Sequence, residues 1–366
     1  MEDVVTRFAL MTVLAGTLAT GPAGAELAEV PEPLRFPEPR AYVCPRVDLP
    51  PEIDGRLDDA AWVGVPWTED FADIEAGERQ PRYRTRCRLA WDDTCLYIAA
   101  ELEEPEIRAA IRERDGVLFR DNNFEVFLDP DGDTHDYYEI EVNAHGAVWD
   151  LFLARAYRDG GPVLTAWDVR GLRTAVGLRG TLNDDRDVDE GWCVEIAVPW
   201  DGIREHAHTE CPPRPGDRWR ANLARVEWPD GRWDAGQRPV DPYTGEPHAE
   251  DNWVWSPPGI VSMHYPELWG VVQFSGAAAT AAAEEYVPSP LDPGRRALRM
   301  LYYRERNHFH EYGRFTEDVG ELGLAAMELP GWQWPPEVYV TPHWFEATTI
   351  GPDGVRIWIG RDGRIR

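Results

Sequence analysis

In residues 121–129 the chain reads Asp-Asn-Asn-Phe-Glu-Val-Phe-Leu-Asp, and this stretch decides the fold. Apolar side chains at positions 124, 126 and 128 alternate with Glu125, Phe127 and Asp129. Successive side chains of a strand point to opposite faces, so the alternation predicts a strand with one face on a core. The other face would carry an acidic group beside an aromatic ring.

The residues that follow complete a hairpin. Residues 130–135 make a polar turn, after which Glu139, Glu141 and Asn143 alternate with apolar positions 140 and 142. In the hairpin these three polar residues should share a face with Glu125 and the phenylalanine two positions after it. Such a face is either a ligand face or a solvated face whose acids pair with arginines.

Similar short patterns extend in both directions along the chain. Further strands are predicted at residues 83–91, 96–100, 148–153, 193–198, 219–225 and 271–274. Many short strands separated by Gly, Pro and Asp turns, with few helical patterns, predict an all-β protein. We therefore expect an antiparallel β-sandwich of the jelly-roll or immunoglobulin-like type, with a small α+β appendage at the C-terminus.

The N-terminus has the pattern of an export signal. Arg7 precedes the apolar stretch 8–18, and a small-residue segment ends at Ala25. This order is typical of a cleavable signal peptide, which predicts a secreted or periplasmic protein. The apolar stretch is too short to span a bilayer, so no membrane insertion is expected.

Composition shifts divide the rest of the chain. The predicted order is signal peptide 1–25, extended leader 26–41, sandwich 42–276, linker 277–290 and C-terminal module 291–366. In the last module a helix should begin at Asp292 and Pro293 and end at Gly313, because proline suits a first turn and glycine a C-cap. A short second helix is expected at residues 316–322, followed by a hairpin around 351–363.

Charge and cysteine content exclude several classes of function. A net charge of −29 argues against nucleic acid as a partner. Five cysteines leave at least one unpaired, and no pairing can be assigned from their positions. No Cys-x-x-Cys pattern is present, which argues against a structural zinc site. The same charge argues against anionic membranes and polyuronates as partners, and a monomer is expected.

Five motifs in a fixed order carry a resemblance to a known family. They are Ile53-Asp-Gly55 with Trp62, Trp91-Asp-Asp-x-x-Leu-Tyr97, the stretch 121–129, Gly191-Trp-Cys-Val-Glu-Ile-Ala-Val-Pro-Trp200, and Asn252-Trp-Val-Trp-Ser256 with Trp269-Gly270. In this order, over roughly residues 42–276, the chain resembles the carbohydrate-binding modules of family 9. The resemblance implies a non-catalytic β-sandwich that binds a plant or microbial polysaccharide or its oligosaccharides.

The resemblance also implies site residues. In binding members of family 9, two tryptophans sandwich a terminal sugar while a glutamate, an arginine and an asparagine bond its hydroxyls. The second tryptophan falls on Trp255, the asparagine on Asn252 and the glutamate on Glu125. The first tryptophan falls on Phe119, which offers a smaller flat face, and the arginine falls on Glu141, which replaces a donor by an acceptor. A place in the sandwich core is the alternative for Trp255.

Two further expectations concern aromatic platforms and metal. Trp228 and Trp233 lie in a Pro/Gly/Asp loop and are candidates for further exposed platforms. The turn Asp129-Pro-Asp-Gly-Asp133 lacks the acid of an EF-hand at its twelfth position, where Ile140 stands. Family 9 modules can carry structural calcium, which makes calcium the one candidate cofactor. An ordinary hairpin turn is the alternative.

Three rival functions stay open. A scaffold or surface-assembly protein could keep the sandwich with a degenerate sugar pocket. A glycoside hydrolase would need paired carboxylates, and residues two apart on a strand, such as Glu139 and Glu141, lie about 6.6 Å apart. A haem module would need an axial ligand such as His145, Met263 or His264.

Overall fold

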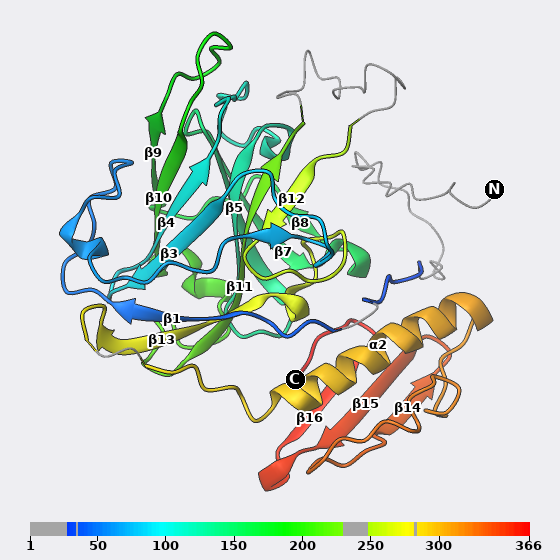
Figure 1. Cartoon of the computed structure of the whole chain (residues 1–366). Helices are drawn as coiled ribbons and strands as arrows, with labels where there is room; N and C mark the ends of the chain where they lie inside the picture. The colour runs from blue at the N-terminus through cyan, green and yellow to red at the C-terminus, as the bar shows by residue number, and fades with distance from the viewer. Residues whose placement is uncertain (1–27, 34–35, 230–247, 282–283) are drawn as a thin grey trace.

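The computed structural model describes residues 28–33, 36–229, 248–281 and 284–366. It shows a large β-sandwich with a smaller helix-and-sheet module beside it (Figure 1). The predicted signal peptide lies outside the described residues. The sandwich confirms the expected all-β fold class.

The strands of the sandwich form one continuous sheet that folds over on itself. They are β1 (Ala41–Arg46), β2 (Ala72–Asp73), β3 (Thr85–Trp91), β4 (Cys95–Glu103), β5 (Asn123–Asp129), β6 (His135–Asn143), β7 (Val148–Arg155), β8 (Val163–Leu164), β9 (Arg173–Arg179), β10 (Gly191–Pro199), β11 (Arg218–Glu227), β12 (Asp251–Val254) and β13 (Gly270–Ala278). Their order is β8-β7-β6-β5-β11-β13-β1-β3-β4-β10-β9, with β12 beside β11 and β2 beside β12. Every pair is antiparallel except those of β1, which runs parallel to β13 and β3. The expectation of a purely antiparallel sandwich is wrong at this strand, because β1 joins the two layers by entering between the last strand and β3.

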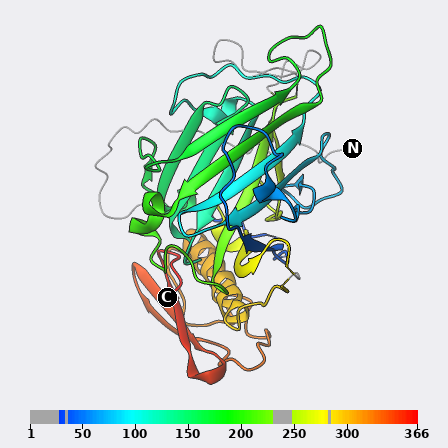
Figure 2. The ribbon, with the colours of Figure 1, turned by 90° about the vertical axis from the view of Figure 1, so that its left-hand side faces the viewer.

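Short helices connect some of these strands. They are η1 (Ala60–Trp62), η2 (Leu118–Arg120), η3 (Tyr157–Asp159), α1 (Trp200–Ile203), η4 (Arg204–His206) and η5 (Pro266–Leu268). Figure 2 looks onto the layer formed by β3, β4, β10 and β9, with the C-terminal module below it.

The main core lies between the two layers. The apolar positions of the predicted alternation, such as Phe124 and Ile140, meet Leu89, Ile98 and Ile196 from the opposite layer. All five are fully buried. Burial of this size supplies most of the folding free energy of a sandwich, at about 25 cal/mol per Å² of apolar surface.

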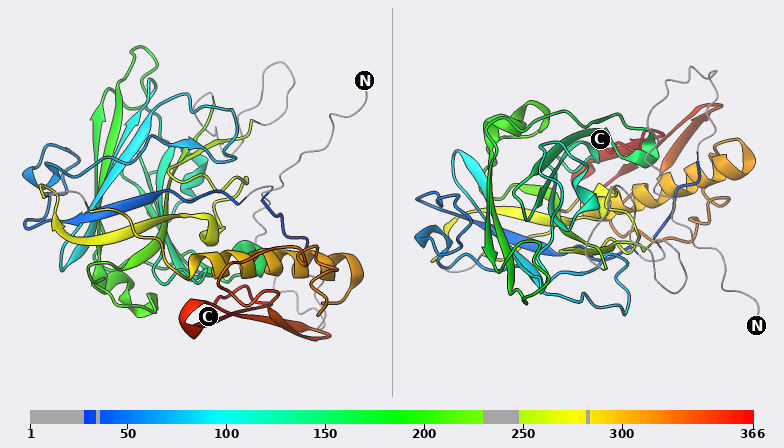
Figure 3. Two further views of the ribbon diagram at one scale, coloured as in Figure 1. Left: turned by 60° about the horizontal axis from the view of Figure 1, so that its bottom comes forward. Right: turned by 90° about the horizontal axis from the view of Figure 1, so that it is seen from above.

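The C-terminal module packs one helix on a three-stranded sheet. Helix α2 (Asp292–Tyr312) ends at Gly313, whose φ of 70° is the left-handed conformation that glycine favours at a C-cap. The sheet consists of β14 (Glu337–Thr341), β15 (Trp344–Ile350) and β16 (Arg356–Gly360), with η6 (Pro352–Gly354) between the last two strands. Helix α2 lies between this sheet and the sandwich (Figures 1 and 3).

The predicted second helix is wrong. Residues 316–322 form turns, in which side chains bond to nearby backbone groups. Thr316 Oγ1 accepts the N–H of Asp318 at 3.1 Å, and Asp318 Oδ1 accepts the N–H of Gly320 at 2.8 Å. Such local bonds compete with the helical ladder and favour turns.

The leader and the module share a core with the sandwich. Val30, Leu298 and Phe345 pack with Tyr265 and Leu268 in one apolar cluster. Val30 also exchanges two hydrogen bonds with the Asn307 side chain, at 2.8 and 2.9 Å. The leader is therefore part of the folded structure, although the sequence predicted only an extended segment.

A buried ion network joins the same parts. Arg158 bonds both carboxylate oxygens of Glu267, at 2.8 and 2.9 Å, and Arg306 bonds Asp159 at 2.8 Å. Arg299, which is 1% exposed, lies 3.6 Å from Glu267. Helix α2 is thus fixed to the sandwich by charge pairs as well as by apolar packing.

All five cysteines are free thiols, which agrees with the absence of an assignable pairing. Among the described residues, none of the helices combines the length and the apolar character that crossing a membrane requires.

Candidate functional site

The face of β5 and β6 that points away from the main core carries acidic side chains. Glu125 pairs with Glu141, Phe127 with Glu139, and Asn123 with Asn143, so the predicted common face is confirmed. This face is not solvated, because Glu125, Glu139 and Glu141 are only 4%, 5% and 2% exposed. A second apolar cluster covers it, formed by residues such as Leu118, Phe127, Tyr137, Leu151, Met263 and Trp269. The alternative of a wet face paired with arginines is therefore wrong.

Glu125, Glu139 and Glu141 form what we call the carboxylate cluster. One oxygen of each lies within 4.8 Å of the others. The Asn123 side-chain amide donates to Glu125 Oε1 at 3.1 Å and to Glu141 Oε2 at 2.8 Å. Glu139 Oε2 is buried and has no hydrogen-bond partner among the described residues. A buried acceptor without a donor is costly, so this atom marks a place where a ligand could donate.

Burial changes the protonation of the cluster. It raises the pKa of Glu125 to about 7, and it raises the pKa values of Glu139 and Glu141 well above their ordinary range. Repulsion from Glu125 adds to the rise at the other two. Carboxyl groups that keep their proton at neutral pH are hydrogen-bond donors as well as acceptors. The cluster can therefore offer both kinds of group to a ligand.

Aromatic rings lie beside the cluster. Tyr157 is 54% exposed, and the charges of the three glutamates help burial to raise its pKa. Its ring meets His264 edge-on at 4.5 Å between centroids. His264 is bonded through Nδ1 to the Tyr137 hydroxyl at 3.0 Å, and burial together with Arg158 lowers its pKa to about 3. His264 is thus a neutral ring packed among aromatic side chains.

Four of the five predicted site residues share this face. Asn252 pairs with Val226, which in turn pairs with Asn123, so Asn252 lies on the cross-strand row next to the cluster. Phe119 in η2 is half-buried against the covering apolar cluster, and its backbone bonds Glu141. Phe119, Glu125 and Glu141 are therefore neighbours, whereas Asn252 lies on the same face but two strands away from β5.

Trp255 does not join them. It is fully buried in the main core, where Tyr42 meets it edge-on at 6.5 Å. Its indole N–H donates to Glu69 at 3.3 Å. Residues three apart along an extended segment point to opposite faces, so Asn252 and Trp255 cannot serve one ligand from the same side. The structure contradicts the stacking role and confirms the core alternative.

The additional platforms also differ from expectation. Trp228 is 1% exposed and donates its indole N–H to the Phe119 carbonyl at 2.9 Å, so it supports η2 from beneath. Trp233 lies outside the described residues. Asn123 was not predicted from the sequence as a site residue. Asn123 lies two positions before Glu125 on the same strand, so the alternation already placed both side chains on one face.

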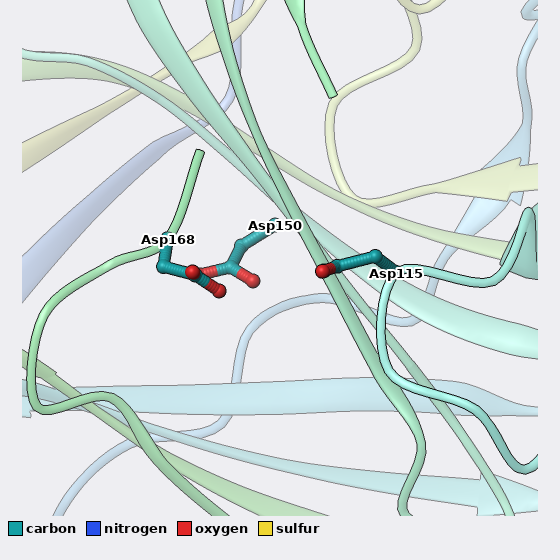
Figure 4. Close-up of side chains that lie close together, drawn as sticks. All are labelled: Asp115, Asp150 and Asp168. Atoms are coloured by element: carbon teal, nitrogen blue, oxygen red, sulfur yellow. The ribbon is translucent and has the colours of Figure 1, made fainter. Parts of the chain in front are cut away.

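A second acidic group lies elsewhere on the sandwich. Asp150 on β7 and Asp168 lie close together, and Asp115 faces them from the loop before η2 (Figure 4). Arg114 Nη2 bonds both Asp150 and Asp168 at 2.5 Å. The arginine already supplies the positive charge that these carboxylates require, so the group is explained without a ligand.

The turn between β5 and β6 contacts the C-terminal module. Asp129 accepts the backbone N–H groups of Gly132 at 3.1 Å and Thr134 at 3.0 Å. Arg364 of the C-terminal module forms an ion pair with Asp133, and Arg299 bonds Thr134 at 3.1 Å. These bonds are those of an ordinary hairpin turn with a protein partner. Structural calcium here stays a prediction.

The raised pKa values lead to a testable pH dependence. Above the ordinary glutamate pKa, the folded cluster keeps protons that the unfolded chain releases, so the free energy of unfolding should fall as pH rises from 5 to 8. Replacing Glu139 by glutamine (Glu139→Gln) should remove part of this fall and raise stability at pH 8 by about 1 kcal/mol or more. Urea unfolding at both pH values measures it.

The matched control is Glu103→Gln, since the Glu103 side chain is 46% exposed at the end of β4. The Glu103→Gln substitution should leave the pH dependence of the free energy of unfolding as it is in the parent protein. If the free energy of unfolding falls by the same amount between pH 5 and pH 8 in Glu139→Gln and in the parent protein, the proposed protonation of the cluster is contradicted.

Comparison with known proteins gives one family match, over part of the chain. A family model described as carbohydrate family 9 binding domain-like matches residues 53–211. None of the curated proteins matches the chain. The matched residues include β5, β6 and the whole carboxylate cluster.

Solved structures with similar folds were also found. A proposed carbohydrate-binding protein from Bacteroides uniformis ATCC 8492 is 17% identical, with a TM-score of 0.49, and the match covers 65% of this chain and 100% of that one. A family 9 carbohydrate-binding module from Caldicellulosiruptor kristjanssonii, in complex with cellotriose, is 16% identical, with a TM-score of 0.39 and coverage of 68% and 100%. The complex of a family 9 module from the same organism with glucose is 17% identical, with a TM-score of 0.39, and the match covers 69% of this chain and 100% of that one. Residues 53–211 are thus similar to the family described as carbohydrate family 9 binding domain-like.

Proposed function

We propose that the chain is an exported, non-catalytic protein that binds a plant or microbial polysaccharide or its oligosaccharides at the carboxylate cluster. The observation that carries the proposal is the unpartnered Glu139 Oε2, buried at the centre of a polar cluster within the matched domain. A sugar hydroxyl can donate to this oxygen and accept from a neighbouring protonated carboxyl. Neutral sugars therefore suit the cluster without a metal or a cofactor.

Protonation accounts for the exchange of the family's arginine for Glu141. A neutral carboxyl donates a hydrogen bond through its O–H, and burial keeps Glu141 neutral by raising its pKa. Glu141 can thus take the donor role of the arginine that family 9 members carry at this position. Asn252 adds an amide on the same face.

Aromatic stacking would come from residues other than Trp255. Tyr157 is the half-exposed ring beside the cluster, and Phe119 flanks Glu141 through its backbone. We place the entrance of the site at Tyr157, because the carboxylates themselves are at most 5% exposed and must be reached from a neighbouring surface. A tyrosine ring can pack on the C–H face of a pyranose while its hydroxyl stays in water.

The test is a calorimetric binding screen of the purified protein against plant and microbial polysaccharides and their oligomers. Glu125→Gln should weaken binding of any sugar found by about tenfold or more, because a buried hydrogen-bonding group left without its partner costs about 1–3 kcal/mol. Tyr157→Ala should weaken it by a similar factor. Glu103→Gln, on the opposite layer, is the matched control and should bind as the parent protein does. Unchanged affinity in both site variants would place the sugar elsewhere.

A scaffold with a degenerate pocket is the second candidate. Two observations favour it, the burial of Trp255 and the loss of the family arginine at Glu141. On this alternative the folded protein binds none of the sugars in the screen, while its C-terminal module still makes contact with a partner.

A further inference from the structure

A cavity of about 530 Å³ lies where the sandwich meets the C-terminal module. The leader, the turn between β5 and β6, β11, η5 and helix α2 all contribute to its wall. We call it the interface cavity. It shares no residue with the carboxylate cluster, and its volume lies within the range of small-molecule sites.

Arginines with unused donors line this cavity. Arg299 is 1% exposed and bonds Thr134 at 3.1 Å and the Gly363 carbonyl at 2.7 Å through Nη2. Its Nη1 and Nε form no hydrogen bond with any described residue, although Nε lies 3.6 Å from Glu267 Oε1. Arg295, one turn earlier on α2, has a buried Nε without a partner and forms no salt bridge within the described ranges. A buried guanidinium with unbonded N–H groups is unfavourable unless a further acceptor is bound.

A third arginine faces the same space. Arg220 on β11 bonds the Trp269 carbonyl at 2.8 Å, and its only ion-pair partner in the described structure is Asp292, at 3.9 Å. Burial lowers the pKa of Arg220. Arg220, Arg295 and Arg299 thus converge on the cavity from the sandwich and from α2.

The acidic residues of the wall do not satisfy these donors. Glu267 is already held by Arg158 through both oxygens, and although burial alone would raise its pKa, Arg158 and Arg299 lower it to about 2. Glu38 pairs with Arg296 at 2.8 Å. Asp292 and Glu328 also line the cavity, so its wall carries as many carboxylates as arginines. Within the described residues, the donors of this wall that remain without a hydrogen bond are Nε of Arg295 and Nε and Nη1 of Arg299.

Apolar side chains also line the cavity. It includes Phe36 from the leader, Leu268 from η5, Met300 from α2, Leu329 and Ile365. A ligand that fits must therefore combine an anionic group with an apolar body.

We propose that the interface cavity binds a small organic carboxylate, with its anionic group on Arg295, Arg299 and Arg220 and its apolar body against Phe36, Met300 and Leu329. The planar fork of arginine matches a carboxylate in two parallel hydrogen bonds. The strongly negative protein opposes the entry of multiply charged anions, which favours a monoanion. The ligand would bridge the two modules, since the arginines come from both.

The test is isothermal titration of the purified protein with benzoate, and with benzamide as the neutral probe of the same shape. Benzoate should bind saturably and benzamide should not. Arg295→Gln should weaken benzoate binding at least tenfold, since it removes a charge that no described protein group uses. Arg304→Gln is the matched control on the same helix, because Arg304 pairs with Glu32 outside the cavity wall.

Two further probes identify the source of the anion. Glucuronate binding tighter than benzoate would identify an acidic sugar as the carboxylate, and inorganic phosphate binding without either organic acid would overturn the apolar half of the proposal. Equal binding of benzoate and benzamide, or unchanged binding by Arg295→Gln, would overturn the whole. If Arg295→Gln does not fold, Arg295→Lys keeps the charge and should still lose affinity, because lysine lacks the planar fork. None of these outcomes depends on sugar binding at the carboxylate cluster.

Discussion

Replacing Trp255 by alanine (Trp255→Ala) is expected to lower the free energy of unfolding by about 3–5 kcal/mol, as large-to-small changes of buried aromatic residues do. The side chain is fully buried between the layers, against Tyr42 and beside Gly270, where its ring occupies the position that a Cβ would need. Its removal leaves a large cavity in the core and takes the indole donor from Glu69. Guanidinium unfolding followed by tryptophan fluorescence measures the change.

Tyr339→Ala on β14 is the control for removal of an aromatic ring, since Tyr339 is 62% exposed and its loss should change stability by about 0.5 kcal/mol or less. A Trp255→Ala protein that keeps its stability but loses sugar binding would contradict the buried position and restore the stacking role. Any loss of sugar binding in this variant must therefore be compared with its loss of structure.

The second large effect is expected at Arg225, which is fully buried on β11. Its Nη2 bonds Glu104 at 2.5 Å and Glu227 at 2.7 Å, and its Cζ lies 5.1 Å from the centroid of the Trp253 ring. Arg225→Met should destabilise the protein by about 3–5 kcal/mol, because the two buried carboxyl groups lose the guanidinium to which they are bonded. Urea unfolding at pH 7 measures it.

The loss at Arg225 should depend on pH in a defined direction. Burial, and then repulsion from Glu227, raise the pKa of Glu104 to about 8, so the folded state retains a proton that the unfolded chain releases above its ordinary glutamate pKa. The variant lacks the attraction of Arg225 that lowers the pKa of Glu104, so its deficit relative to the parent should shrink as the pH falls from 9 to 7. The control is Arg186→Met, which removes an exposed pair with Asp184 and should have no measurable effect. A deficit that grows on acidification would contradict this account.

Local alternation predicted the fold better than it predicted the environment of the site. The period of two in β5 and β6 placed Glu125, Glu139 and Glu141 on one face, and the register confirms it. Alternation cannot say what covers that face. The covering residues come from distant segments, among them Leu118 and Met263, so burial of the carboxylates was not predictable from the strands themselves.

Motif matching failed at one residue for a geometric reason. Asn252 and Trp255 were placed in one site by their spacing, yet the backbone of β12 continues extended and turns them to opposite sides. In the C-terminal module, the long helix followed from its apolar spacing and its caps, which are local signals. The network of Arg158, Glu267 and Arg299 joins three segments far apart in sequence, and no local pattern indicates it.

The shared core of leader, sandwich and module makes the chain a single cooperative unit. Tyr265 and Leu268 belong to the sandwich segment but are buried by the side chains of helix α2. A sandwich cut off at residue 276 would expose this apolar surface to water and would leave Arg158 and Glu267 without the tyrosines and arginines that surround them. The whole chain should accordingly melt in one transition whose calorimetric and van't Hoff enthalpies agree. Evolution of the sandwich strands and of the terminal helix is then constrained jointly, because a change that loosens either one lowers the stability of both.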